Sequence, residues 1–307
     1  MALAGGGDPG ALAAGLRREV TGLGLRALAA KMLHAAVSAP DRLTDIYDSA
    51  AAGWGSGPLF APGLRAYPPE APSPEFWGAF WTLMETPPGQ PGVYAFRTAQ
   101  LAGLLPPTLN GRIAEAAWAY PGVRAAAADG IPERFNLNDL IRCPTGSLGG
   151  LFYRQVVSDG MKLEGMDRHL LGLAGLPAPL GYLNTRILQC HHLWRLTAGY
   201  KTTGLHQIAM AGFLMGQFGH HHSSLFLGLV ISTVALQRPP SPEVVLDTIL
   251  GGWTHGRRTP PLLATPWESL WHLPVETVRA RLGVMPFESP YPADLIERAG
   301  RWSGTTP

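Results

Sequence analysis

Apolar residues recur at helical spacing along most of this chain, and this pattern constrains the fold more than any other feature of the sequence. No stretch alternates apolar and polar residues for long, as a half-buried strand would. The 38 Gly and 29 Pro residues lie between the periodic segments rather than in repeats, which is typical of loops and helix ends. We therefore expect an all-α fold.

Length and composition limit the number of domains. The chain has 307 residues, of which 46% are hydrophobic, and this is enough for one large core or two small ones. We expect a flexible N-terminus over residues 1–9 and a single mostly helical domain over residues 10–300.

The periodic segments predict individual helices. One or two helices are expected over residues 11–37, and an irregular loop over the Pro-rich residues 56–73. Later helices are expected over residues 75–84, 95–104, 110–120, 147–159, 182–197, 205–218, 223–236, 242–256 and 274–282. Residues 129–143 are expected to be a connector, and residues 265–268 have the spacing of a capping box.

Charge and apolar run length restrict the partners and the location. The net charge is +2 and only 15% of the residues are charged, so no nucleic-acid partner is expected. The longest apolar run, residues 225–236, is too short to span a bilayer, and the N-terminus lacks the pattern of a secretory signal. Cys143 and Cys190 are expected to be free thiols in a reducing cytoplasm. We predict a cytoplasmic protein, with peripheral contact at the inner face of the membrane as a further expectation.

Polar, titratable residues interrupt the apolar helical pattern in one place, residues 189–217. His191 and Arg195 are four positions apart, so they lie on one face of the predicted helix 182–197. His192 is rotated by about 100° from His191 on the same helix.

A short connection after Gly199 suggests that this helix and the next one form the central antiparallel hairpin of the domain. In such a hairpin Gln207, near the start of the helix 205–218, comes level with the polar residues of the first helix. Small residues in the second helix allow a close neighbour. The predicted cluster consists of His191, His192, Arg195 and Gln207.

The spacing of these four residues matches a known motif. The sequence resembles the coenzyme Q (ubiquinone) biosynthesis protein four family, in which a helix carries His-Asp-x-x-His and a Glu follows after eleven residues. The flanking sequence LWRLTAGY agrees, and so do the segments 143–154, CPTGSLGGLFYR, and 256–284. The resemblance is strongest over residues 140–284.

Only His191 keeps the residue of the family's metal site, because His192 replaces its Asp, Arg195 its second His and Gln207 its Glu. Arg is not deprotonated in proteins and cannot be a metal ligand. We therefore expect no tightly bound metal and no other cofactor, with the guanidinium of Arg195 in the place of the metal's charge. The alternative is a divalent ion, Zn or Mg, held weakly by His191 and His192.

The resemblance implies a helical protein that binds a prenylated aromatic quinone precursor beside the membrane and its partner enzymes. In that family the metal site removes a carboxylate and introduces oxygen at ring carbon one. Since the motif has changed here, we expect a lyase-like or tailoring enzyme that acts on a hydrophobic, anionic, quinone-like substrate without tightly bound metal. Two alternatives stay open: a non-catalytic protein that holds quinone intermediates for the pathway, and a ring-carbon decarboxylase or hydroxylase with weakened metal dependence. A homodimer is also left open.

Each candidate residue has an expected role and a plainer alternative. We expect Arg195 to bind the anion, His191 or His192 to act as general acid or base, and Gln207 to orient the substrate. Substrate contacts are predicted for Arg195, Trp194, Lys201 and Phe213. The alternatives are buried histidines that donate to backbone carbonyls, a structural ion pair for the arginine, a surface amide for the glutamine, and aromatic side chains that belong to the core.

Overall fold

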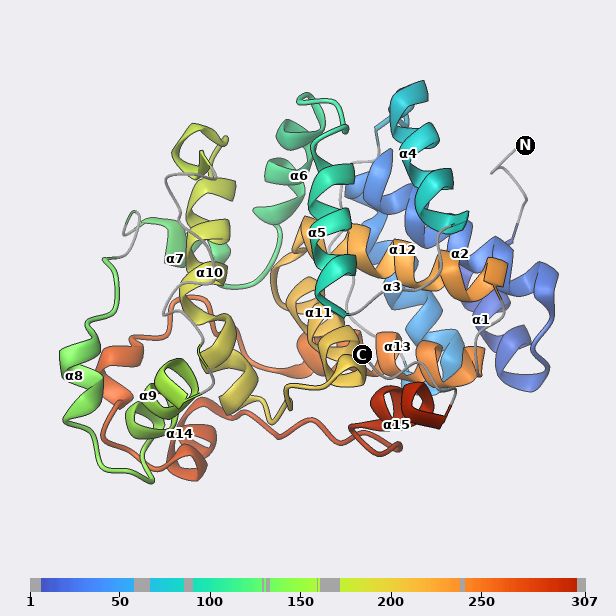
Figure 1. Ribbon diagram of the computed structural model, residues 1–307. Coiled ribbons are helices and arrows are strands. Elements are labelled where there is room, and N and C mark those ends of the chain that lie inside the picture. Colours follow the sequence, from blue (N-terminus) through green and yellow to red (C-terminus); the bar gives the residue numbers. More distant parts are fainter. Residues whose placement is uncertain are drawn as a thin grey trace. The chain divides into compact units, whose positions relative to one another are not determined.

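The computed structural model describes residues 7–57, 67–85, 91–128, 130, 133–158, 160, 172–237 and 241–302. Within these ranges the secondary structure is helical, and the β pairing is limited to one isolated antiparallel bridge between Ser147 and Pro274 (Figure 1). The predicted all-α fold is confirmed. No helix in this part of the chain is long and apolar enough to cross a membrane.

Residue contacts divide the chain into two compact units, each made from separate stretches of sequence. Unit 1 comprises residues 1–119, 202–258 and 289–307, and unit 2 comprises residues 120–201 and 259–288. Whether the two units pack into the single domain that we predict is not tested by these contacts, so the single domain stays a prediction.

Unit 1 contains most of the helices. Those from its first stretch are α1 (Pro9–Arg18), α2 (Gly22–Val37), α3 (Leu43–Ala51), α4 (Pro74–Glu85), α5 (Pro91–Ala102) and α6 (Leu109–Ala117), with short helical turns η1 (Pro40–Arg42) and η2 (Ala52–Ser56). Those from its later stretches are α11 (Gly204–Phe218), α12 (His221–Gln237), α13 (Pro242–Arg258) and α15 (Leu295–Trp302).

The most extensive helix contact of unit 1 joins α11 and α13. Glycines remove the side chains between the two backbones: a Cβ atom on Gly212 would lie 2.7 Å from the carbonyl oxygen of Ile249, and one on Gly216 would lie 2.6 Å from that of Trp253. Since real Cβ atoms do not approach so closely, only glycine fits at these positions. The close neighbour that the small residues of this helix predict is therefore α13.

A second long-range contact of unit 1 joins α2 and α12. The imidazole of His221 donates from Nε2 to the carbonyl oxygen of Ala36, 185 positions earlier, at 2.6 Å. Apolar side chains from both helices enter the core, among them Leu28 and Leu227, which are fully buried. The N-terminal helices therefore depend on partners from the second half of the sequence.

The start of unit 1 is ordered from Asp8 onward. The carboxylate of Asp8 accepts from the backbone N–H of Ala11 at 2.9 Å, and α1 begins at Pro9. This is an ordinary helix N-cap. The rest of the predicted flexible terminus, residues 1–6, lies outside the described residues, as do residues 58–66 of the predicted loop.

Unit 2 is smaller and is arranged around one long helix. Its helices are α7 (Val123–Ala128), α8 (Leu137–Ile141), α9 (Leu148–Ser158), α10 (Leu180–Thr197) and α14 (Val275–Leu282), with short turns η3 (Leu173–Gly175) and η4 (Trp267–Leu270). The rings of Phe135, Phe152 and Trp271 pack together, with centroids 5.1 to 6.3 Å apart. The predicted connector therefore contains a short helix, α8, whose flanking Phe135 belongs to this core.

The predicted capping box at residues 265–268 is wrong. The turn η4 begins after Pro266, and no side chain caps it. A capping box needs an α-helical first turn, in which the third residue reaches back to the cap. Here the helical turn is a short 3-10 segment, so the reciprocal bonds do not form.

Buried Arg186 fixes the first half of α10 within unit 2. Its guanidinium donates to the carbonyl oxygens of Leu263 at 3.2 Å and Thr265 at 2.7 Å, and to the side-chain oxygen of Gln189 at 2.7 Å. These bonds satisfy the buried cation without a carboxylate. Cys190, beside this group, is a buried free thiol, and Cys143 is also free, as predicted.

The C-terminal end of α10 is fixed by α14. Arg279 donates to the carbonyl oxygens of Leu196 at 3.1 Å and Thr197 at 2.8 Å, which have no acceptor role inside the helix. The backbone N–H of Phe287 donates to the carbonyl oxygen of Ala198 at 2.8 Å. The polar residues of α10 therefore lie on a helix that is held near both ends.

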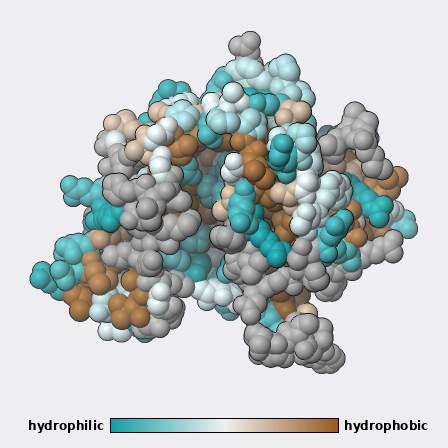
Figure 2. All heavy atoms as spheres, turned by 45° about the horizontal axis from the view of Figure 1, so that its top comes forward, coloured by the Kyte–Doolittle hydropathy of each residue, from teal (hydrophilic) through white to brown (hydrophobic). Residues whose placement is uncertain are grey.

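The surface mixes polar and apolar residues. On the face shown in Figure 2, hydrophilic residues alternate with smaller apolar patches. Large apolar side chains that are exposed include Leu23, Trp81, Ile141 and Met285. Such exposure is normal for single residues and gives no site by itself.

Candidate functional site

Three of the four predicted site residues, His191, His192 and Arg195, lie on α10 of unit 2. The fourth, Gln207, lies on α11 of unit 1 and is exposed. The predicted hairpin joins a helix of one unit to a helix of the other. Its geometry, and the approach of Gln207 to the other three residues, therefore stay predictions.

The residues on α10 present two imidazoles and one guanidinium. The rings of His191 and His192 lie edge to face, with centroids 5.3 Å apart and planes at 87°. Both histidines are partly buried, whereas Arg195 is only 6% exposed. The helix thus places a buried cation one turn beyond His191, as its spacing predicts.

Gln155 is a site residue that the sequence did not indicate. It lies on α9, and its side-chain oxygen is 3.5 Å from a terminal nitrogen of Arg195. This is a long hydrogen bond. Gln155 directly follows CPTGSLGGLFYR, a segment that resembles the ubiquinone biosynthesis family, and this position could have drawn attention to it.

Both histidines are neutral at neutral pH. Burial, helped by the neighbouring His192 and by the charge of Arg195, lowers the pKa of His191 to about 3. Burial and Arg195 lower the pKa of His192 to about 4. Arg195 therefore supplies the positive charge of this group, and both imidazoles lie in its field.

The imidazole of His192 has a buried polar atom without a partner among the described residues. Nδ1 of His192 is buried and forms no hydrogen bond there. An unsatisfied buried nitrogen costs free energy, and such atoms are uncommon in folded proteins. It is the kind of atom that a ligand could satisfy.

The remaining predicted substrate contacts lie in different surroundings. Trp194, on α10, is fully buried, and Lys201, just after that helix, is exposed. Phe213 lies on α11 of unit 1, is fully buried, and has its ring 5.2 Å from that of His255. Their contacts with a substrate stay predictions.

The donor set on α10 differs from the ligand sets that divalent ions commonly use. Among the described residues, no three His, Cys, Asp or Glu side chains are grouped so that they could hold a metal. The two imidazoles lie edge to face rather than side by side, and the guanidinium beside them repels a cation. Zinc and magnesium sites use more ligands, and magnesium needs oxygen donors. The metal-free site and its weak-metal alternative at His191 and His192 both stay predictions.

Comparison with known proteins gives a likeness of fold. No protein-family model matches the chain, and no curated protein matches it. A solved structure from Nostoc punctiforme PCC 73102, of a protein provisionally assigned to ubiquinone biosynthesis, matches with a TM-score of 0.50. The match covers 68% of this chain and 94% of that chain, at 20% sequence identity.

The chain shares that protein's fold. At this identity the likeness does not carry an activity or a substrate across, because one fold supports many functions. Function therefore has to be argued from the residues of the site.

Proposed function

We propose that this chain binds a hydrophobic, anionic, aromatic or quinone-like molecule beside Arg195 and acts on it by acid/base chemistry without a tightly bound metal. The observation that carries the proposal is electrostatic: a buried guanidinium, Arg195, lies one turn beyond His191 on the same helix, and its charge adds to burial in lowering the pKa of both His191 and His192. An anion placed beside the imidazoles would offset this positive potential. The sequence resemblance of residues 140–284 to the ubiquinone biosynthesis family supports a quinone-like ligand.

The proposed role of the histidines follows from the same potential. A bound anion opposes the charge of Arg195, so it raises the pKa of His191 and His192 from about 3 and about 4. An imidazole whose pKa moves toward neutrality is a better proton carrier. Nδ1 of His192, which has no partner among the described residues, is the atom assigned to the proton.

Decarboxylation shows how these groups would act together. The bond between the ring and the carboxylate breaks, carbon dioxide leaves, and the electron pair stays on the ring carbon. That carbon then takes a proton that His192 has first taken from water, and the hydroxide left behind combines with the carbon dioxide as bicarbonate. The negative charge moves from the carboxylate to the ring during the reaction, and Arg195 stabilises it there.

A second function, binding of a quinone intermediate without chemistry, is favoured by the low pKa values themselves. Imidazoles with pKa values of about 3 and about 4 are poor bases near neutral pH. If a bound ligand does not raise the pKa values of His191 and His192, the site binds an anion but does not catalyse a reaction.

The replacement Arg195→Gln tests the anion site. The probe is a hydroxybenzoate with an alkyl chain, and its methyl ester serves as the neutral comparison, with binding measured by calorimetry. We expect the variant to bind the acid at least about tenfold more weakly, because charge-assisted hydrogen bonds contribute roughly 1.5–3 kcal/mol. The ester should bind equally to both proteins.

The control is Arg142→Gln, which removes an exposed arginine of the same unit. It should leave both affinities unchanged. Equal binding of the acid to the Arg195→Gln variant and the unaltered protein would refute the anion site. Release of carbon dioxide from the bound probe, lost in His192→Asn, would then separate catalysis from binding alone.

A further inference from the structure

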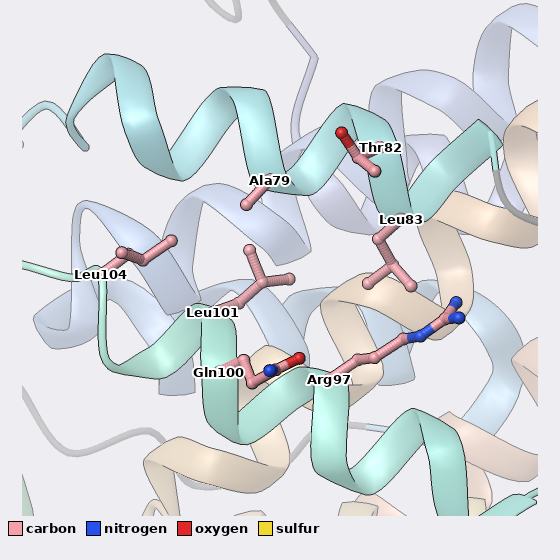
Figure 3. Close-up of a pocket in the computed structure, with 7 residues that line it drawn as sticks. All are labelled: Ala79, Thr82, Leu83, Arg97, Gln100, Leu101 and Leu104. Atoms are coloured by element: carbon pink, nitrogen blue, oxygen red, sulfur yellow. The ribbon is translucent and has the colours of Figure 1, made fainter.

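A pocket of about 300 Å³ lies in unit 1 between α4 and α5, on helices that carry none of the candidate site residues of α10 and α11. This volume is at the small end of the range for ligand pockets. The lining residues are Ala79, Thr82, Leu83, Arg97, Gln100, Leu101 and Leu104 (Figure 3).

The wall of the pocket is apolar. Leu83 from α4 and Leu101 from α5 extend into the space between the two helices (Figure 3), and they are 6% and 3% exposed. Leu104 is 40% exposed beside them. An apolar chain laid along these leucines would cover surface that water now contacts, at roughly 25 cal/mol per Å².

Arg97 adds a positive charge to this apolar wall. Its side chain extends along the pocket toward Leu83 (Figure 3), and Gln100 lies one turn further along the same face of α5. Among the residues that the structure describes, Arg97 has no carboxylate within ion-pair distance. The adjoining sequence 86–96, TPPGQPGVYAF, contains no acidic residue.

The other polar group of the pocket does not compete for an anion. The hydroxyl of Thr82 donates to the backbone carbonyl oxygen of Gly78 at 3.0 Å, so its proton is already used. The strong donors that face the pocket are the guanidinium of Arg97 and the amide of Gln100. A guanidinium binds a carboxylate through two parallel hydrogen bonds.

We propose that this pocket binds a small amphipathic carboxylate. Its apolar chain lies against Leu83, Leu101 and Leu104, and its carboxylate lies on Arg97 with Gln100 as a second donor. The small volume favours a medium-length chain over a long one. This site uses residues of unit 1 only, so it is independent of the function proposed for α10.

Calorimetry with decanoate below its micelle concentration tests the site, and decan-1-ol is the uncharged comparison. Arg97→Gln should weaken decanoate binding at least about tenfold, since the charge-assisted bonds are lost, and should leave decan-1-ol binding unchanged. Ala79→Phe, which fills the pocket, should weaken the binding of both probes. Circular dichroism checks that each variant is folded.

Two control variants identify the site that is measured. Arg26→Gln removes an exposed arginine of α2 and should bind decanoate as the unaltered protein does. Arg195→Gln reveals any decanoate that binds at the group on α10, and in that background Arg97→Gln should still weaken the remaining binding. The proposal is overturned if the unaltered protein does not bind decanoate, or if Arg97→Gln and Ala79→Phe bind it with unchanged affinity. Loss of decanoate binding in Arg195→Gln alone would assign the binding to α10 and also overturn it.

Discussion

Two arginines of α10, Arg186 and Arg195, are both buried yet have contrasting surroundings. Arg186 donates to two backbone carbonyls and to Gln189 at distances of 2.7 to 3.2 Å. The hydrogen bond of Arg195 to Gln155 measures 3.5 Å. Short bonds from a buried guanidinium to backbone acceptors are typical of a structural cation.

If Arg195 serves a ligand, as proposed, and Arg186 serves the fold, the two substitutions should lower stability by unequal amounts. Arg186→Gln should lower the free energy of unfolding by about 3 kcal/mol, because it leaves buried carbonyl oxygens without donors. Arg195→Gln should lower it by less than about 1 kcal/mol. Urea unfolding of both variants beside the unaltered protein measures the difference. A larger loss for Arg195→Gln would make Arg195 the structural residue.

The part of the site that lies on one helix could be predicted from the sequence. Spacing along α10 alone places Arg195 one turn beyond His191. Gln155 could not be predicted in this way, because it meets Arg195 across 40 positions of sequence through the packing of α9 against α10. Periodicity describes the faces of a helix but not which faces meet.

Among the elements, the long helices and the short helix α14 could be predicted from the sequence, but several other short helices could not. The predicted helix 205–218 matches α11 closely, whereas α3 and α15 were not predicted. Short helices are marginal alone and depend on tertiary contacts. In α15, Glu297 accepts from the backbone N–H of Gly204, 93 positions earlier, at 2.7 Å.

The contact between α11 and α13 gives a prediction at the scale of elements. Gly216→Leu should lower the free energy of unfolding by about 3 kcal/mol or more, because its Cβ would lie 2.6 Å from the carbonyl oxygen of Trp253. Gly78→Ala on α4 is the matched control. Nothing lies within 4 Å of a Cβ at that position, so the change should stabilise by about 0.5–1 kcal/mol.

Thermal and urea unfolding of these two glycine variants would measure both effects. If Gly216→Leu unfolds at the same urea concentration as the unaltered protein, the close approach of α11 and α13 is wrong.

For the whole molecule, buried histidines predict loss of stability in acid. Burial lowers the pKa below the ordinary value of 6.5 for His34, His191, His192, His221 and His222. As the pH falls below about 6.5, the unfolded chain therefore binds protons before the folded chain does. Each such group removes up to about 1.4 kcal/mol of stability per pH unit.

Urea unfolding at pH 7.5 and pH 5 would measure this effect, with lower stability expected at pH 5. The variant His191→Gln should lose less stability between the two pH values than the unaltered protein loses. Equal or higher stability at pH 5 would contradict the neutral state of these histidines.

The division into two units could not be predicted from the sequence, because neither unit is a continuous stretch. The composition allowed one large core or two small ones, and no local change in composition marks positions 119, 201, 258 or 288. The boundaries reflect contacts between distant helices, which local periodicity does not encode.

The pairing of α2 with α12 has a consequence for synthesis of the chain. The hydrogen bond between Ala36 and His221 cannot form until the ribosome has added the 185 residues that separate them. At translation rates of about 5–20 residues per second, this delay is on the order of ten seconds or more. During that time the apolar face of the N-terminal helix is exposed on the ribosome. The speed of translation, rather than the final stability, then determines how long this surface is open to aggregation.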